Sequence, residues 1–337
     1  MAYDLADMKG RIKNILNPLL KDKTGNICII DPPGHPNVGD SAILLGELDF
    51  IRENFPKASI FFFDVDNYSE RSDRFIDDAS VLLIHGGGNF GDIWPHHHKV
   101  RSRILDRFPG KPIIQLPQSI HFSSDEECRR TAALIDKQSN FTLMVRDRRS
   151  QAYAEKHFGC PVVLSPDMAF AMRPMKRKPS SVDYFALLRT DKEGVIDQHG
   201  VLEALRGTGR SVEVADWLDD PETLTMTIDR ALTRVTRRAP AVAALKGGLV
   251  MRQRERYARQ RLAHGIDLLS RGATVVADRL HAHILCALLG VPHYVFDSFD
   301  GKISAFNSTW EGDAARSPVV TSADFERVLK ESTPLGN

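Results

Sequence analysis

Residues 274–289, TVVADRLHAHILCALL, decide the fold of this chain. A β-branched, apolar run that is typical of a buried strand is followed directly by a run with helical character. Arg279 and His281 stand where the two runs meet. Unpaired backbone N–H groups and the positive end of the helix dipole lie at such a junction, so the two cationic side chains are placed where an anion is favoured.

The same alternation of strand and helix extends through the first half of the chain. Strand-like runs are predicted at residues 27–30, 60–63, 81–84, 112–116, 142–145 and 162–164. Helical patterns are predicted between them at residues 42–55, 97–108, 126–139 and 149–158. Because the strands are continuously apolar, they fit a parallel sheet that is covered by helices on both faces.

Residues 173–181, RPMKRKPSS, interrupt this rhythm and are interpreted as an interdomain linker. Beyond them, strands are predicted at 184–188, 211–215, 274–277 and 294–296, with helices at 222–236, 257–269 and 282–289. We therefore expect an α/β fold of two Rossmann-like domains facing a cleft, with an N-terminal domain of residues 1–175 and a C-terminal domain of residues 180–337. Ligands of such folds bind at the carboxyl ends of the strands, so the motifs should meet there.

Composition narrows the class of protein. Lys and Arg number 45 against 44 Asp and Glu in 337 residues, and this net charge of +1 provides no field that would attract nucleic acid. The four cysteines are far apart, which indicates neither a metal site nor a disulfide framework. With no signal peptide and no apolar run of membrane-spanning length, we expect a cytoplasmic protein.

Residues 4–22 are predicted to form a basic amphipathic helix. Its apolar positions follow helical spacing and are Leu5, Met8, Ile12, Ile15, Leu16, Leu19 and Leu20. The stripe either packs against the chain's own sheet, which is the favoured interpretation, or gives peripheral association with a membrane surface.

The glycine-rich segment HGGGNFGD, residues 85–92, follows a predicted strand. Glycines at this position either let backbone N–H groups approach a ligand or serve a tight turn. The spacing is neither GxGxxG nor a P-loop, so no dinucleotide or P-loop nucleotide is indicated. The candidates for a cleft loop are Gly86, Gly87, Gly88, Asn89 and Asp92.

Two other segments supply titratable side chains. In WPHHHKVR, residues 94–101, successive histidines on a helix point about 100° apart, so we expect no metal, and we keep His97 and His98 as proton donors or sugar contacts. A partly exposed helix start is the alternative. Asp40 is interpreted either as a helix N-cap, a role that Ser41 could also serve, or as a catalytic carboxylate in the cleft that hydrogen-bonds or deprotonates an acceptor hydroxyl.

Polar residues also follow two further strands. Gln118 and Ser119 come just past the strand at 112–116. Arg189 follows the first strand of the second domain, either as a salt-bridged surface residue or as an anion ligand beside Arg279 and His281.

Six segments, taken in order, resemble the polysaccharide pyruvyl transferase family. They are NVGD at 37–40, GGGNFGD at 86–92, LPQS at 116–119, VRD at 145–147, SPD at 165–167 and RLH at 279–281. The resemblance implies a two-domain layout like that of the B-type glycosyltransferases. It also implies transfer of a pyruvyl group from phosphoenolpyruvate to two hydroxyls of one sugar, which forms a ketal on an exopolysaccharide or cell-surface polysaccharide precursor.

The resemblance also implies roles for individual residues. Arg279, Leu280 and His281 belong to the family's donor site, and Arg189 resembles its second donor arginine. Gln118 and Ser119 match a motif near the cleft, and we count them with the donor site. The resemblance further implies a glycan acceptor that is lipid-linked and is met at the inner membrane surface.

The chemistry of these residues agrees with that activity. Arg279 and Arg189 suit the phosphate and carboxylate of the donor, and His281 suits a general acid or base. Asp40, with His97 or His98, is expected around the acceptor, and no metal or other cofactor is expected. Two alternatives stay open: a nucleotide-sugar-dependent glycosyltransferase of the same layout, and a non-catalytic sugar or phosphate-binding protein. The oligomeric state also stays open.

Overall fold

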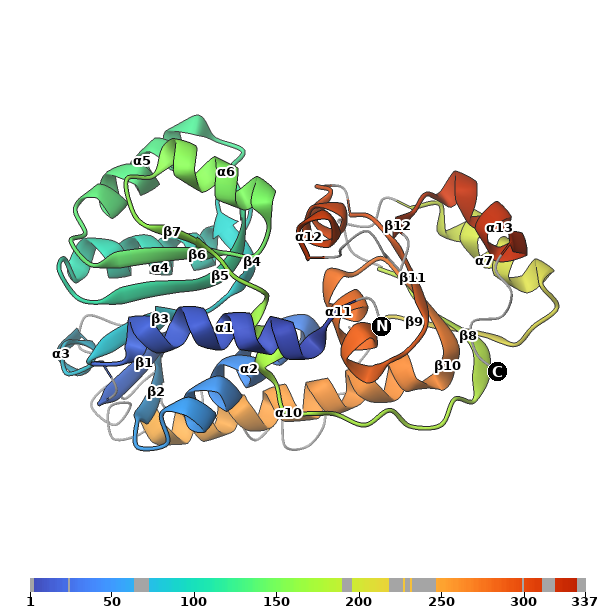
Figure 1. Ribbon diagram of the computed structural model, residues 1–337, viewed down its shortest axis with the longest axis horizontal. Helices are drawn as coiled ribbons and strands as arrows, with labels where there is room; N and C mark the ends of the chain where they lie inside the picture. The colour runs from blue at the N-terminus through green and yellow to red at the C-terminus, as the bar shows by residue number, and fades with distance from the viewer. Residues whose placement is uncertain are drawn as a thin grey trace.

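The computed structural model describes residues 3–23, 25–63, 73–189, 196–217, 227, 231, 247–298, 300–310 and 319–331. Two parallel sheets lie side by side along the long axis of the molecule (Figure 1). Each sheet carries helices, so the predicted α/β class with two Rossmann-like units is confirmed.

The first sheet contains seven strands, all in parallel pairs. Its main order is β2 (Ser59–Phe63), β1 (Asn26–Ile30), β3 (Val81–Ile84), β5 (Ile113–His121), β6 (Phe141–Val145) and β7 (Val162–Leu164), and β4 (Gly87–Gly91) pairs with β5 off this path. Its helices are α2 (Val38–Asn54), α3 (Asp73–Asp77), α4 (Pro95–Arg107), α5 (Asp125–Asp136), α6 (Arg148–His157) and the short 3₁₀ helix η2 (Met168–Ala171).

The second sheet contains five strands. Its order is β12 (Val319–Val320), β11 (His293–Phe296), β10 (Gly272–Ala277), β8 (Val182–Leu187) and β9 (Val212–Ala215). Its helices are α7 (Gln198–Gly207), α11 (Leu280–Leu289), α12 (Lys302–Trp310) and α13 (Ser322–Glu331). The helix predicted over 222–236 lies outside the described residues except for positions 227 and 231.

A long helix joins the two halves. Helix α10 (Gly247–Arg271) precedes β10 in the chain, yet it runs beneath both sheets and packs against α2 and β2 as well as β8 (Figure 1). Arg52 of α2 donates two hydrogen bonds of 2.7 Å to Glu255 of α10. The sequence predicts only the part at 257–269, because charged residues in the earlier turns hide the apolar stripe.

The N-terminal helix α1 (Leu5–Leu20) also connects the halves. Its buried face is Met8, Ile12, Leu16 and Leu20, so the stripe packs against the chain itself, as the favoured interpretation predicted. Tyr3, just before the helix, reaches the second half, where its hydroxyl donates to Asn307 Oδ1 at 2.9 Å. None of the described helices is both long and apolar enough to cross a bilayer.

The structure corrects two local predictions. The glycine-rich segment is not a simple loop, because residues 87–91 form β4; Gly91 has a φ of 132°, and a Cβ there would lie 1.6 Å from the carbonyl oxygen of His121. The N-cap interpretation of Asp40 or Ser41 is wrong, because α2 starts at Val38 and Asn37 caps it by accepting from the Gly39 N–H at 2.8 Å. Asp40 therefore lies in the first turn, with its carboxylate available for other contacts.

Candidate active site

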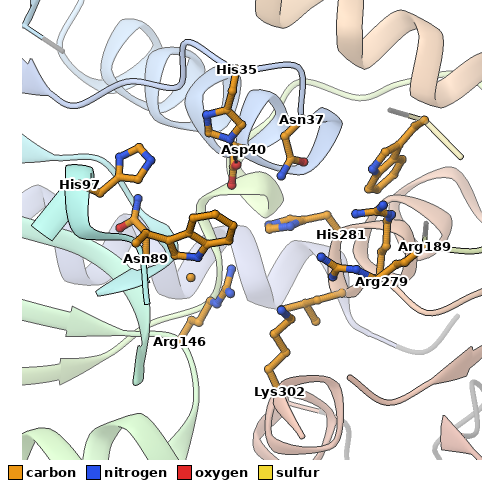
Figure 2. Close-up of a pocket in the computed structure, with 14 residues that line it drawn as sticks. His35, Asn37, Asp40, Asn89, His97, Arg146, Arg189, Arg279, His281 and Lys302 are labelled. Atoms are coloured by element: carbon orange, nitrogen blue, oxygen red, sulfur yellow. Dashed lines mark hydrogen bonds and ion pairs between the residues drawn. The ribbon is translucent and has the colours of Figure 1, made fainter. Parts of the chain in front are cut away.

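A cavity of about 430 Å³ lies between the two halves of the molecule. The first half lines it with His35, Asn37, Asp40, Gly88, Asn89, Trp94, His97 and Arg146, and the second half with Arg189, Trp217, Arg279, Leu280, His281 and Lys302 (Figure 2). Arg146, Arg189 and Arg279 follow the carboxyl ends of β6, β8 and β10. The residues of both halves therefore meet at the carboxyl ends of the strands, where the ligand site was predicted.

Positive charge dominates the cavity wall. Four fixed cations line it, Arg146, Arg189, Arg279 and Lys302, whereas Asp40 is the one carboxylate among its described lining residues. In Figure 2, Arg189, Arg279 and Lys302 point toward the same space from the second half, and Arg146 enters it from the first. This arrangement favours a small ligand with more than one negative charge.

Arg279 has the position that the sequence predicts, directly before the first residue of α11. Its Nη2 donates to both carboxylate oxygens of Asp216, at 2.9 and 2.7 Å, and its guanidinium carbon lies 5.5 Å from the centroid of the Trp217 ring. These contacts orient the guanidinium, which also borders the cavity.

Asp278 lies beside Arg279 and supports the neighbouring Arg189. Both of its carboxylate oxygens accept from the Arg189 backbone N–H, at 3.0 and 3.2 Å. Burial raises the pKa of Asp278 to about 6, although that hydrogen bond and the charges of both arginines act in the opposite direction.

Arg146 is a cavity residue to which the sequence analysis gave no role. Its Nε donates to Ser119 Oγ at 2.9 Å, and its Nη1 donates to Asp167 at 2.7 Å. Ser119 in turn donates to Asp147 at 2.8 Å. Ser119 therefore holds Arg146 from behind and does not line the cavity.

Gln118 also lies behind the wall. Its Nε2 donates to the His85 carbonyl and to Asn89 Oδ1, both at 2.9 Å, and its Oε1 accepts from the Asn89 N–H at 3.1 Å. Gln118 is fully buried and orients Asn89, which does reach the cavity. The structure thus gives Gln118 and Ser119 positioning contacts, where the sequence analysis expected contacts with the donor.

His281 faces the N-terminus of α2 across the cavity. Its Nε2 lies 3.5 Å from Asp167 Oδ2, and its ring lies so close to Gly39 that a Cβ there would be 2.4 Å from Nδ1. Burial alone would raise the pKa of Asp167, but His281 and Arg146 outweigh it and hold that pKa well below its usual range. An ionised carboxylate thus lies between an imidazole and a guanidinium.

Asp40 lies on the other side of His281. Its Oδ2 is 2.7 Å from His35 Nε2. Burial opposes ionisation, but the hydrogen bond with His35 and the charges of His35, His281 and His85 hold the pKa of Asp40 well below its usual range. Asp40 is thus a carboxylate in the cavity and suits the role of a hydrogen-bond acceptor.

The three adjacent histidines take three different positions. His97 lines the cavity, and its Nδ1 lies 2.6 Å from Asp31 Oδ2. His98 turns to Glu127 at 3.3 Å, and burial together with Arg101 lowers its pKa. His96 is exposed. The structure therefore brings His97 to the cavity, and neither His96 nor His98 lines it.

The residues of the predicted cleft loop also differ in whether they line the cavity. Gly88 and Asn89 line the cavity. Gly86 donates its N–H to the buried Glu47 at 3.0 Å, and Gly87 adopts a φ of 126°. Asp92 accepts from the N–H and hydroxyl of Ser123 and from the Ser124 N–H, at 2.8 to 2.9 Å, and so closes the turn before α5.

Sequence reasoning missed several contributors. Asp31 had a usable signal, since it follows directly on the apolar strand β1. His35, Trp217 and Lys302 reach the cavity from positions that no local pattern marks, and Trp94 lies in a segment that was noted only for its histidines. Among the described residues, no group of three His, Cys, Asp or Glu side chains could hold a metal ion.

Known proteins resemble this chain in sequence and in fold. The chain is 32% identical to Pyruvyl transferase 1 of Schizosaccharomyces pombe over 301 residues, which cover 84% of this chain and 69% of that protein. It is 28% identical to the putative pyruvyl transferase EpsO of Bacillus subtilis over 318 residues, covering 91% and 92% of the two chains. The crystal structure of a functionally uncharacterized protein of Klebsiella pneumoniae shares the fold, with a TM-score of 0.62 at 18% identity over 94% of this chain and 99% of the other.

The segment that matches the family includes most of the residues that line the cavity. The sequence model described as Polysaccharide pyruvyl transferase matches residues 37–300, and all the lining residues except His35 and Lys302 lie within that match. The relatives and the matched segment lead to one conclusion: the chain is an enzyme of the polysaccharide pyruvyl transferase family.

Proposed function

We propose that the enzyme transfers the pyruvyl group of phosphoenolpyruvate to two hydroxyls of one sugar residue and forms a cyclic ketal. The observation that carries this proposal is the group of four fixed cations around one cavity that also contains His281 and the ionised Asp40. Phosphoenolpyruvate bears a phosphate and a carboxylate on three carbons, so it matches both the charge and the small size of the site.

The second half is suited to hold the donor. Arg279 and Arg189 clamp its two anionic groups, and the N-terminus of α11 adds backbone N–H groups beside Arg279. Lys302 and Arg146 lie across from them and compensate the charge of the leaving phosphate. These cations can do this work without a metal, so no cofactor is part of the proposal.

The reaction needs balanced proton transfers. One sugar hydroxyl adds to C2 of the donor while C3 gains a proton; the C2–O bond to phosphate then breaks, and the second hydroxyl adds to C2. Two hydroxyl protons are lost, one is gained at C3, and the other leaves with phosphate. His281 is placed to give the C3 proton, because the carboxylates of Asp167 and Asp40 beside it can balance an imidazolium.

The first half is suited to hold the acceptor. Asp40, His97 and Asn89 offer hydrogen-bond partners for hydroxyls, and the indole of Trp94, 39% exposed, offers an apolar face for a sugar ring. The acceptor is then a glycan of an exopolysaccharide or cell-surface polysaccharide precursor. That it is lipid-linked and met by a cytoplasmic enzyme at the inner membrane surface is supported by the family resemblance alone.

Two experiments test the proposal. Thermal-shift titrations should show stabilisation by phosphoenolpyruvate and none by nucleoside diphosphates, whereas a nucleotide-sugar-dependent glycosyltransferase predicts the reverse. Phosphate release from phosphoenolpyruvate should then depend on one member of a panel of p-nitrophenyl glycosides, with a ketal identified in the product by NMR. No phosphate release with any glycoside of a broad panel, together with no stabilisation by phosphoenolpyruvate, refutes the proposal.

Variants separate donor binding from chemistry. Arg279→Ala should weaken binding of phosphoenolpyruvate tenfold or more, because the guanidinium contacts the donor in ground and transition states alike. His281→Ala should lower turnover by about 10² to 10⁴ with a smaller change in affinity. Wild-type kinetics in both variants would contradict the assigned roles.

A further inference from the structure

Two histidine–carboxylate pairs lie next to each other on the wall of the first half. His97 Nδ1 is 2.6 Å from Asp31 Oδ2, and His35 Nε2 is 2.7 Å from Asp40 Oδ2. The two imidazole rings meet edge to face, with centroids 6.0 Å apart, and both border the cavity (Figure 2). The residues come from two separate segments, the loop into α2 with its first turn and the start of α4.

Each pairing determines which ring nitrogen remains for a ligand. In a neutral imidazole whose N–H is donated to a carboxylate, the other ring nitrogen carries the lone pair. His97 therefore presents Nε2, and His35 presents Nδ1. Within the described part of the chain, neither of these two atoms has a hydrogen-bond partner. The arrangement of a carboxylate behind an imidazole base is the one that hydrolytic triads use.

The geometry of Asp31 indicates that its pair is more than a surface contact. Asp31 is the one non-glycine residue with a positive φ, 63°, among the described residues, and it is 3% exposed. Its Oδ2 faces His97, while its Oδ1 is buried without a hydrogen-bond partner. A strained backbone and a desolvated carboxylate both lower stability, and such features concentrate at functional sites.

We infer that His97 and His35 are two separate general bases, one for each of the two hydroxyls that form the ketal, with Asp31 and Asp40 as positioning residues. This inference rests on the proposed function. Because the two rings are in edge-to-face contact and both border the cavity, a diol of one sugar ring can approach the pair from the cavity side, with each hydroxyl directed at a different imidazole.

With two bases, each of the two hydroxyl protons has its own acceptor. In the first addition, one imidazole takes a hydroxyl proton as the C2–O bond forms, and the electron pair of the C2–C3 double bond takes a proton from His281. In the second, phosphate leaves with the electron pair of its C2–O bond, and the other imidazole takes the second hydroxyl proton as the ketal closes. One of the two protons held by the imidazoles then passes to phosphate, and the other restores the proton that His281 gave to C3. Neither base has to discharge its proton between the two steps.

The test uses isosteric variants and follows each addition separately. His97→Gln, His35→Gln and the control His96→Gln, an exposed neighbour on the same helix, are compared in D₂O with phosphoenolpyruvate and the p-nitrophenyl glycoside that supports phosphate release in the wild type. The first addition is read as deuterium at C3 in recovered phosphoenolpyruvate or in a singly linked adduct. The second addition is read as ketal.

The two single variants should fail at different stages. One should lose both deuterium at C3 and ketal, and the other should retain deuterium at C3 while ketal formation falls about 10²-fold or more. His96→Gln should behave as the wild type. If both variants fail at the same stage, or both form ketal within about threefold of the wild-type rate, the inference is overturned.

Asp31→Asn tests the positioning role without a packing change. Asparagine tolerates a positive φ and keeps an oxygen toward His97, but it removes the charge. Turnover should fall tenfold or more with an unchanged KM for phosphoenolpyruvate, and Asp31→Asn should add little in the His97→Gln background. Full additivity of the two changes would overturn the role of Asp31. If the wild type itself releases no phosphate, the proposed function fails; if it forms ketal and only the variants disagree, this inference alone fails.

Discussion

Gly39→Ala should disable the enzyme by displacing one side chain of the opposite half. A Cβ at Gly39 would lie 2.4 Å from His281 Nδ1 and 2.6 Å from its Cγ, whereas ordinary contacts begin at 3.4 Å. The imidazole would therefore have to retreat by about 1 Å, the difference between the 3.4 Å of an ordinary contact and the 2.4 Å available. That movement changes its 3.5 Å approach to Asp167.

The magnitude follows from that displacement. A misplacement of about 1 Å costs about 10²-fold in rate, which corresponds to about 2.7 kcal/mol in the activation free energy. Affinity for phosphoenolpyruvate should change less than threefold, because the three heavy atoms nearest to a Cβ at Gly39 all belong to His281 and none to the proposed donor clamps Arg279 and Arg189. The free energy of unfolding should change little, because the crowding of about 1–3 kcal/mol is partly offset by about 1 kcal/mol of helix propensity gained with alanine.

The assay is phosphate release at saturating donor and acceptor, with donor affinity measured by calorimetry and folding by urea titration. Gly10→Ala is the matched control, since it lies within α1 and a Cβ there would meet nothing within 4 Å. It should raise the free energy of unfolding by about 0.5–1 kcal/mol and leave turnover unchanged. Turnover of Gly39→Ala within about threefold of wild type would refute the role of the His281 position.

Three further predictions concern charge and pH. Burial raises the pKa of Asp278 to about 6, so the free energy of unfolding of the wild type should fall as the pH rises from about 4 to 6 and this carboxyl ionises. Asp278→Asn lacks that ionisation, so its free energy of unfolding, measured in urea titrations, should rise by roughly 2–3 kcal/mol relative to the wild type between these two pH values. Burial lowers the pKa of His283 to about 3 and of His293 to about 4, so the folded protein keeps both neutral, and its stability should fall as the pH drops below about 6.5. In His293→Gln, the slope of the unfolding free energy against pH in this acidic range should decrease by the equivalent of about one proton, and an unchanged slope would contradict the burial argument. Arg279→Lys should weaken phosphoenolpyruvate binding about tenfold in calorimetry, because lysine cannot contact Asp216 and the donor with one planar fork; an unchanged Kd would show that charge alone suffices.

The elements near the cavity were predictable where local pattern and local geometry coincide. The run at 274–277 and the helical run after it fall within β10 and α11, so Arg279 and His281 lie at the expected helix N-terminus. The predicted strand at 81–84 matches β3 residue for residue. In these places the apolar run is continuous and the turn is short, so the periodicity alone determines the structure.

Other features escaped because their cause lies elsewhere in the chain. Strand β4 contains three glycines and few apolar side chains, so it has no periodicity, and it forms because its backbone pairs with β5. The choice among the three histidines depended on Asp31, which is 66 residues away from His97 in the sequence. Gln118 and Ser119 were predicted to follow a strand that ends at residue 116, but β5 continues to His121 and contains both of them. Only the fold shows that they orient Asn89 and Arg146.

A common arrangement explains how this cavity can keep so much charge before its donor arrives. Arg146 has Asp167 behind it, Arg279 has Asp216, and Asp278 accepts from the backbone of Arg189. Buried arginines without such partners would repel one another and bear the full penalty of desolvation. The carboxylates of Asp167 and Asp216 reduce that penalty and hold the guanidinium planes of Arg146 and Arg279 in place, so the entropy of orienting these two side chains is lost during folding and not during donor binding. On the opposite wall, His35 is paired with Asp40 and His97 with Asp31 in a similar way. Under the proposed function, the two halves of the molecule present pre-oriented cations to the anionic donor and pre-oriented imidazoles to the diol, which is the division of roles that such a transfer requires.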